Sequence, residues 1–262
     1  MNGEVYKKEY VRKVDKSQIP TCNILGVNIA AIDMQWLLAF LEKNMHNLSG
    51  DYMCVSNVHT TVTASEESDY LKIQNGGIMA IPDGGPLSVV GRMRGHEKMQ
   101  RTTGPDLMGE VFKITAKKGY RHYFYGSTEE TIEKLRVNLE KNYPGIEIAG
   151  MYSPPFRKMT AEEDLEIIKE INVTSPDFIW VGLGAPKQER WMAEHQGVFN
   201  GLMIGVGAGF DYYAGNIKRA PMWMQKANLE WLYRFVQDPK KLFKRYLYTN
   251  TKFIWNVMIR GK

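Results

Sequence analysis

Short apolar runs alternate with longer amphipathic stretches along most of the chain after residue 23. Apolar residues that recur every three or four positions indicate helices, and the short apolar runs between them indicate buried strands. The pattern predicts strands at 23–29, 52–57, 77–85, 121–126, 146–152, 177–184 and 201–211, and helices at 33–45, 59–75, 104–119, 127–145, 160–174 and 186–196. Such alternation favours a mostly parallel sheet with helices on both faces. We therefore expect an α/β, Rossmann-like fold.

Residues 218–262 differ from the rest of the chain in charge. They hold eleven Lys and Arg against two acids, together with nine aromatic residues, whereas the whole chain has a formal charge of +5. Apolar positions at helical spacing predict two amphipathic helices, the second starting at Asp238–Pro239. We expect a polar N-terminal extension (1–22), an α/β domain (23–217) and a basic helical appendage (218–262).

The composition indicates a folded protein of a reducing compartment. Apolar residues make up 44% of the chain, and its two cysteines are too few for a disulfide framework. The charged N-terminus lacks the features of a signal peptide. The most apolar long stretch is interrupted by Gly26 and Asp33, which favours a strand and a capped helix over a membrane span.

Five predicted strands end in loops with polar or glycine-rich sequences. Ligands in parallel α/β sheets bind beyond the carboxyl ends of the strands. In "IPDGGP", Pro82, Gly84 and Gly85 are typical of a turn, and Asp83 is either a turn residue or a carboxylate held out for proton transfer. In "VSNVHT", Asn57 ends a strand, and His59 is either structural or part of a site.

Two further loops have helix starts that suit an anion. Gly126 and Ser127 join a strand to a helix whose free N–H groups could bind a phosphate, and Ser127 with Glu130 also predicts a capping box. In "VGLGAPKQERW", the polar residues Lys187, Gln188 and Glu189 at the helix start favour a ligand site over a plain surface turn, and Gly184 and Pro186 precede them. Neither loop has a dinucleotide-binding or Walker sequence, which argues against a dehydrogenase, a methyltransferase or a standard ATP site.

The chain lacks other catalytic signatures. No HExxH, GxSxG or CxxC sequence is present, and no Asp-x-Asp occurs. No His and carboxylate spacing predicts a metal site, and no cofactor is expected.

Seven motifs taken in order resemble the WecG/TagA/CpsF family of bacterial glycosyltransferases (glycosyltransferase family 26), over roughly residues 23–250. They are "IPDGGPLSVVGR", "RTTGPDL", "YFYGST", "VGLGAPKQERW", "IGVGAGFDYYAG", "KRAPMWMQKANLEWLYRF" and "DPKKLFKRYL". The resemblance implies metal-independent, inverting transfer of a sugar from a UDP-sugar to a polyprenyl-diphosphate-linked sugar. It also implies a role in teichoic acid, common antigen, capsule or exopolysaccharide synthesis.

The resemblance also implies roles for single residues. Asp83 falls on the proposed general base, and Arg101, Gln188 and Asp211 fall on other family motif positions. One departure is Val55, where some members have threonine, so that a threonine's role would be lost or taken by Ser56 or Thr60.

The reaction itself suggests a role for each remaining candidate. A UDP leaving group without a metal needs cations and backbone N–H groups, and Arg101, Arg219 and Arg234 are candidates beside Gly126–Ser127. Gln188 is expected to orient the sugar. Thr103, Gly104 and Asp211 are expected to shape the donor pocket, with Asn57 and Gly84 near them.

The appendage has two interpretations. Its apolar stripe packs on the domain with the bases in water, or it lies on an anionic membrane through Lys241, Lys244 and Arg245. The family resemblance implies contact with the inner face of the cytoplasmic membrane and a possible homo-oligomer. The alternative function is a non-enzymatic nucleotide- or nucleic-acid-binding module that uses the basic appendage. We rank it below the transferase, for which nucleic acid is not an expected partner. The donor sugar stays open among N-acetylmannosamine, glucose, glucuronic acid and others.

Overall fold

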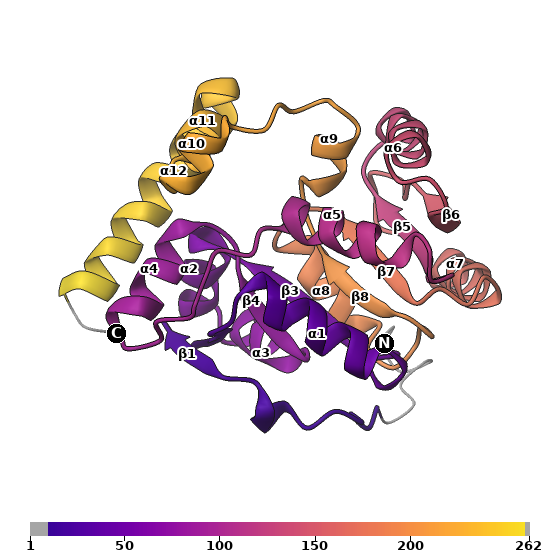
Figure 1. Ribbon diagram of the computed structural model, residues 1–262, viewed down its shortest axis with the longest axis horizontal. Coiled ribbons are helices and arrows are strands. Elements are labelled where there is room, and N and C mark those ends of the chain that lie inside the picture. The colour runs from indigo at the N-terminus through magenta and orange to yellow at the C-terminus, as the bar shows by residue number, and fades with distance from the viewer. Residues whose placement is uncertain (1–9, 260–262) are drawn as a thin grey trace. The chain divides into compact units, whose positions relative to one another are not determined.

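The computed structural model describes residues 10–259, except for the side chains of Lys241 and Met258. The chain forms two compact units, each built from separate segments (Figure 1). Unit 1 comprises 10–15, Leu38–Met53 and Gly104–Ile217, and unit 2 comprises Lys16–Leu37, Cys54–Thr103 and 218–259. Helix α1 (Met34–Asn44) and strand β3 (Tyr52–Ser56) run from one unit into the other.

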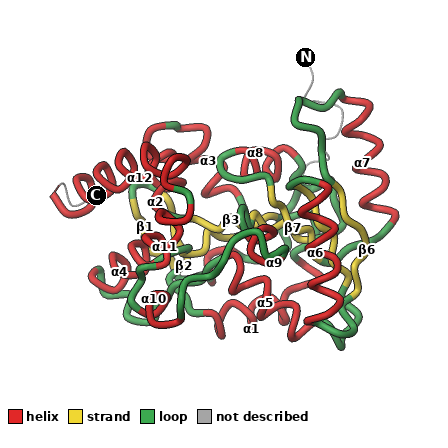
Figure 2. Tube along the Cα trace, turned by 90° about the horizontal axis from the view of Figure 1, so that it is seen from above, coloured by secondary structure: helices red, strands yellow, loops and turns green. Residues whose placement is uncertain are grey.

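Unit 1 is a parallel sheet covered on both faces. Its strands run in the order β3-β8-β7-β5-β6 and are β5 (Arg121–Gly126), β6 (Glu147–Tyr152), β7 (Phe178–Gly182) and β8 (Leu202–Gly205), besides the start of β3. Its helices are α5 (Gly104–Thr115), α6 (Glu129–Asn142), α7 (Ala161–Val173), α8 (Lys187–Glu194) and α9 (Gly209–Tyr213). Figure 2 shows α5 and α8 on opposite sides of the strands.

Aromatic side chains fill the core of unit 1. The ring of Phe112 on α5 makes edge contacts with Trp180 on β7, 5.4 Å between centroids, and with His122 on β5, 5.3 Å between centroids. His122 and Trp180 are fully buried. Burial of these large rings against one another stabilises the α5 face of the sheet.

Unit 2 has a smaller sheet and most of the remaining helices. Its strands β1 (Thr21–Ile24), β2 (Val27–Ala30) and β4 (Met79–Pro82) lie in the order β1-β2-β4-β3. Its helices are α2 (Val58–Glu66), α3 (Ser68–Gly76), α4 (Gly85–Met93), α10 (Met222–Lys226), α11 (Glu230–Gln237) and α12 (Pro239–Ile254), the last followed by a π-helical turn (Trp255–Ile259). Helices α3 and α4 pack on β4, and α12 packs along α2.

The predicted fold class is confirmed. The pairs β2–β4, β5–β6, β5–β7 and β7–β8 are parallel, whereas β1 and β2 are antiparallel. The two helices predicted in the appendage are present as α11 and α12. Residues 218–259 belong to unit 2, and the predicted domain bounds stay a prediction.

Four local predictions were wrong. The strand predicted at 23–29 is a hairpin, because Leu25 (φ 53°) and Gly26 (φ 89°) form a tight two-residue turn between β1 and β2. The helix predicted at 59–75 breaks at Glu67, whose backbone is extended. Residues after Asp83 start helix α4, where the sequence suggested only a turn. The cap of α6 is Thr128, not Ser127.

Candidate active site

Asp83 follows directly after strand β4 and is held from two sides through the backbone. Its N–H donates to the carbonyl of Ser56 at the end of β3, 2.7 Å away. The N–H of Thr102 donates to the carbonyl of Pro82 at 2.8 Å. Asp83 is half-buried. The strand end and the loop before α5 therefore fix the backbone at Asp83, a loop residue beyond a parallel strand as the sequence suggested.

Asn57 contacts Asp83 and also caps helix α2. Its Nδ2 donates to Oδ2 of Asp83 at 3.4 Å, and its Oδ1 accepts from the N–H of Thr60 at 3.2 Å. The hydroxyl of Thr60 accepts in return from the N–H of Asn57 at 2.8 Å, which completes a capping box. The hydroxyl of Ser56 donates to Gln74 at 2.5 Å. The hydroxyls of Ser56 and Thr60, either of which could take the role of a threonine at position 55, thus both have partners within the protein.

Side chains of α11 and α12 lie close enough to Asp83 to act on the same groups. Burial raises the pKa of the Tyr246 hydroxyl, the positive charges of Arg245 and Arg234 oppose this rise, and the carboxylate of Asp83 adds to it. Burial lowers the pKa of His59 on α2, and the charge of Arg245 lowers it further. The base predicted from the sequence thus lies in a polar region enriched in cations.

Two buried nitrogen atoms in this region have no hydrogen-bond partner among the described residues. They are Nδ1 of His59 and Nε of Arg245. Most buried polar atoms in folded proteins have a hydrogen-bond partner. Arg245 also lies over the ring of Tyr246, 5.6 Å from its centroid. His59, which the sequence left open between a structural and a site role, is next to the site.

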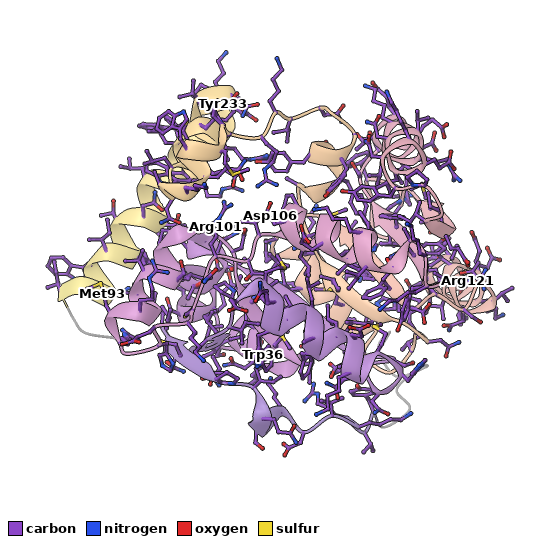
Figure 3. All side chains as sticks on the ribbon, viewed as in Figure 1. Trp36, Met93, Arg101, Asp106, Arg121 and Tyr233 are labelled. Atoms are coloured by element: carbon purple, nitrogen blue, oxygen red, sulfur yellow. The ribbon has the colours of Figure 1, made fainter. Side chains whose placement is uncertain are left out.

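Four side chains, which we name the arginine clamp, join the loop before α5 to helix α11: Arg101, Arg219, Gln225 and Glu230. Nε of Arg219 donates to Oε1 of Glu230 at 2.7 Å, and Nη1 of Arg101 donates to Oε2 of the same carboxylate. Oε1 of Gln225 accepts from Arg219 at 2.9 Å and from Arg101 at 3.4 Å. In Figure 3, Arg101 lies below the helices α10 and α11. The structure therefore brings two predicted arginines together around one carboxylate.

The appendage, whose described residues 218–259 are called the tail from here on, also packs directly on the loop of Asp83. A Cβ atom added to Gly85 would lie 2.3 Å from Cβ of Asn228, which precedes α11. Only a residue without a side chain allows this approach. The sequence assigned Gly85 to the turn alone, and the structure gives it the additional role of a close packing contact with the tail.

Helix α12 has one buried face and one exposed face. Its buried face, Leu242, Thr249 and Phe253, packs along α2, whereas Phe243 and Leu247 are exposed. The apolar stripe predicted along the two helices includes five residues that can be compared with the structure. Leu242 is buried, but Leu232, Val236, Phe243 and Leu247 are exposed. Lys244 is exposed and Arg245 is half-buried, and the side chain of Lys241 lies outside the described part of the structure.

In unit 1, the loop after β5 has an unusual backbone. Gly126 has φ 130°, and Ser127 has φ 64°, in the left-handed region that glycine favours. A Cβ atom at position 126 would lie 2.6 Å from the carbonyl carbon of Gly182, so this position requires glycine. The carbonyl of Ser127 accepts from the hydroxyl of Ser153 at 2.8 Å. This loop, and not a capping box at Ser127, precedes α6.

Gln188 ties two glycine loops of unit 1 together. Its Oε1 accepts from the N–H groups of Gly184 at 3.1 Å and Gly207 at 3.0 Å, and its Nε2 donates to Glu189 at 2.8 Å. Gln188 and Glu189 are buried, whereas Lys187 is exposed. Pro186 follows a cis peptide bond and precedes α8. The structure thus shows Gln188 with both ends of its amide bonded within the protein.

Of the remaining predicted residues, Thr103 precedes α5, Gly104 starts it, and Asp211 lies in α9. Thr103 is buried, and a Cβ atom on Gly104 would lie 3.1 Å from the carbonyl oxygen of Val206. The carboxylate of Asp211 accepts from Nδ2 of Asn216 at 3.2 Å, and its carbonyl accepts from the N–H of Asn216 at 2.9 Å. Asp211 therefore shapes the turn that leads from α9 into the tail.

Two structural properties of residues 10–259 bear on the chemistry. No three His, Cys, Asp or Glu side chains are grouped so that they could hold a metal ion. None of the helices in this range is both long and apolar enough to cross a membrane.

The sequence as a whole matches a known enzyme family. The sequence profile described as "Glycosyl transferase WecG/TagA/CpsF family" covers residues 22–262. The chain belongs to this family. The WecG/TagA/CpsF family consists of glycosyltransferases, so the chain is a glycosyltransferase, and the prediction from the seven motifs is confirmed.

Similar proteins within the WecG/TagA/CpsF family have named activities. A Bacillus subtilis (strain 168) protein is 30% identical over 202 residues, which is 76% of this chain and 77% of that protein. A Staphylococcus aureus (strain MW2) protein is 29% identical over 231 residues, 87% of this chain and 89% of that protein. Each is named N-acetylglucosaminyldiphosphoundecaprenol N-acetyl-β-D-mannosaminyltransferase. Membership of this family favours the transferase over a non-enzymatic nucleotide- or nucleic-acid-binding module.

Sequence reasoning about this WecG/TagA/CpsF member missed three residues of the site region: Gln225, Glu230 and Tyr246. Glu230 and Arg234 are four positions apart on a predicted helix, a spacing that places both side chains on one face. That signal was present in the sequence. The pairing of Glu230 with Arg101, 129 residues away, had no local signal.

Proposed function

We propose that this glycosyltransferase moves a sugar from a UDP-sugar to a polyprenyl-diphosphate-linked sugar, with inversion at the anomeric carbon and without a metal. N-acetylmannosamine is the proposed donor sugar, and N-acetylglucosaminyl-diphosphoundecaprenol is the proposed acceptor, by analogy with the named relatives. The observation that carries the proposal is the placement of Asp83. Its carboxylate stands at a strand end, next to the Asn57 amide and near cationic side chains of the tail.

Asp83 is the proposed general base. The acceptor hydroxyl attacks the anomeric carbon while its proton passes to a carboxylate oxygen of Asp83. The new carbon–oxygen bond forms as the bond from the anomeric carbon to the UDP oxygen breaks, and that electron pair leaves with UDP. A single displacement of this kind inverts the anomeric configuration. The Asn57 amide keeps one carboxylate oxygen oriented by donating to it.

Cations in unit 2 support the departure of a nucleoside diphosphate. Arg101 and Arg219 carry two positive charges against the one carboxylate of Glu230, so that the arginine clamp keeps a net positive charge. Arg234 adds a further cation close to Tyr246. Cations at developing negative charge can replace a metal ion in stabilising the transition state.

In unit 1, the loops at Gly126–Ser127 and Gly184–Gln188 are the proposed donor contacts. Gly126 and Gly184 both have positive φ, a backbone conformation that glycine adopts without strain. Because Gln188 bonds to Gly184 and Gly207, we propose that it acts by holding these loops in shape. Pro186, Lys187, Glu189, Thr103, Gly104 and Asp211 stay predicted members of the donor pocket.

The tail is proposed to bring the enzyme to the inner face of the cytoplasmic membrane. Exposed apolar side chains on the tail stand beside exposed bases such as Lys244: Met222, Trp223, Trp231, Leu232, Val236, Phe243, Leu247, Tyr248, Ile254, Trp255 and Ile259. This combination is typical of peripheral membrane binding. The product would enter teichoic acid, capsule or exopolysaccharide synthesis. Homo-oligomerisation stays a prediction.

The test is transfer in the presence of EDTA. The purified protein is incubated with a panel of UDP-sugars, UDP-N-acetylmannosamine among them, and a synthetic prenyl-diphosphate N-acetylglucosamine, and the product is measured by mass spectrometry. We expect product from the wild type and a loss of about 100-fold or more in Asp83→Asn. Asp69→Asn, on the exposed side of α3, is the matched control and should be fully active. Undiminished transfer by Asp83→Asn would remove Asp83 from the mechanism.

A further inference from the structure

Glu230 on α11 forms ion pairs with arginines from two different segments of unit 2. Its carboxylate, with 16% of the side chain exposed, is the shared acceptor of Arg101 and Arg219 in the arginine clamp. We propose that Glu230 is a positioning residue for sugar transfer, which docks α11 on the loop before α5 and so sets Arg234 near Asp83. This inference rests on the proposed function and assigns a role to a residue outside the reacting groups.

The geometry of α11 connects Glu230 to Arg234. The two residues are four positions apart in one helix, so their side chains lie on the same face with Cβ atoms about 6 Å apart. Arg234 lies about one turn of α11 beyond Glu230, and Asn228, two residues before α11, meets Gly85 in the loop of Asp83. Docking of α11 through Glu230 therefore also fixes the position of Arg234. Loss of the Glu230 contact would leave Arg234 free to move away from the loop of Asp83.

The other side of the clamp leads to Asp83. Arg101 precedes Thr102, whose N–H donates to the carbonyl of Pro82, the residue before Asp83. Between Glu230 and the proposed base there are thus one ion pair, one backbone hydrogen bond and a few covalent bonds. The approach of Asn228 to Gly85 keeps the start of α11 at the same loop.

The charges around Glu230 predict how its loss would change the docking of α11. One carboxylate lies between two guanidinium groups that are only 16% and 27% exposed, so its loss leaves two like charges facing each other with little water to screen them. Glu230→Gln should therefore loosen α11. The opposite interpretation is that Glu230 occupies a phosphate position and competes with the donor, in which case its loss would raise donor affinity.

The experiment compares Glu230→Gln with Glu194→Gln, an exposed glutamate on α8, in the full chain. Hydrogen exchange of the α11 amides without substrate measures docking, and steady-state transfer measures function. We expect faster exchange in α11, unchanged exchange in β7, a fall in kcat of about 10- to 100-fold from misplacement of Arg234, and a donor KM within about threefold of wild type. Glu194→Gln should match the wild type in each.

A second variant guards against general unfolding. Glu230→Asp keeps the charge but shortens the side chain, and it should lie between wild type and Glu230→Gln in both measurements. In the double variant Glu230→Gln/Arg219→Gln, exchange in α11 should increase less than the sum of the single effects, because both residues act through one contact.

Three results would overturn the inference. They are unchanged α11 exchange in Glu230→Gln, unchanged kcat, and tighter donor binding by that variant. The exchange measurement needs no transfer activity, so it separates the two proposals. A wild type that transfers no sugar from the panel refutes the proposed function, while faster α11 exchange in Glu230→Gln would still support docking through the clamp.

Discussion

The Nδ2 atom of Asn57 lies 3.4 Å from Oδ2 of Asp83 and joins the start of α2 to the loop after β4. Asn57 thereby has two separate tasks, since its Oδ1 caps the helix while its Nδ2 reaches the proposed base. Serine in this position can cap a helix but has no amide to donate to Asp83. The two tasks can therefore be separated by substitution.

Asn57→Ser should keep the stability of the wild type and lose about tenfold in kcat, because a hydrogen bond to the charged carboxylate is removed. Asn57→Ala should in addition lower the free energy of unfolding by about 1 kcal/mol through loss of the cap. Urea denaturation and steady-state kinetics measure the two effects. Equal stability losses in both variants would contradict the assignment of the cap to Oδ1.

Gly85→Ala should push the tail off the loop of Asp83. The added Cβ would meet Asn228 at 2.3 Å, and relief of that overlap should cost about 1–3 kcal/mol. Asn228 has φ 59°, which glycine adopts without strain, so Gly85→Ala/Asn228→Gly should recover most of the loss. Thermal unfolding and limited proteolysis of the tail are the measurements. A double variant no better than Gly85→Ala would show that the clash lies elsewhere.

His122 should make the protein less stable in acid. It accepts a hydrogen bond at Nδ1 from Nε1 of Trp180 and bonds through Nε2 to Thr115, and burial lowers its pKa to about 3. The unfolded chain takes up this proton below about pH 6.5, whereas the folded protein does not until about pH 3. Stability is therefore lost as pH falls through that window, by about 1.4 kcal/mol per pH unit from this one group.

Denaturant unfolding at pH 7, 6, 5 and 4 measures that slope. His122→Gln should be less stable at pH 7 because it disturbs the core, but its stability should fall less steeply with acid than that of the wild type. His46→Gln, an exposed histidine, is the control and should keep the wild-type slope. Parallel slopes for all three proteins would mean that the folded protein takes up a proton at His122 as readily as the unfolded chain does.

Phe243→Glu and Leu247→Glu should weaken binding to vesicles that contain anionic lipid, because both side chains are exposed on α12 and the substitutions add negative charge. Val173→Glu changes an apolar side chain that is 84% exposed on α7 and serves as the control. Sedimentation with vesicles should show at least about a tenfold loss of affinity for the first two variants alone. Equal losses in all three would contradict a membrane role specific to the tail.

The sequence predicted the placement of Asp83 because the pattern of strand, loop and helix is local. An apolar run ending in Pro-Asp-Gly-Gly is sufficient to place the carboxylate beyond a strand. The same residues concealed helix α4, since Gly85 and Pro86 are as common at helix starts as in turns. The Leu25–Gly26 turn was missed because leucine is rarely found with positive φ.

The docking of the tail could not be predicted in this way. The contacts of Glu230 with Arg101, and of Asn228 with Gly85, join residues more than a hundred positions apart and depend on packing that a single sequence does not encode locally. Gln188 stays a predicted site residue, and its two backbone partners, Gly184 and Gly207, become visible only in three dimensions.

Unit 2 is assembled from the segments Lys16–Leu37, Cys54–Thr103 and 218–259, and all of Gly104–Ile217 lies between the last two along the chain. During translation, at about 5–20 residues per second, unit 1 is therefore synthesised in full before the residues that complete unit 2 leave the ribosome. Asp83 is made early, but Arg234 and Tyr246 reach it late. A nascent chain thus carries its proposed base before it carries Arg234, so that this site is completed only after unit 1 has been synthesised.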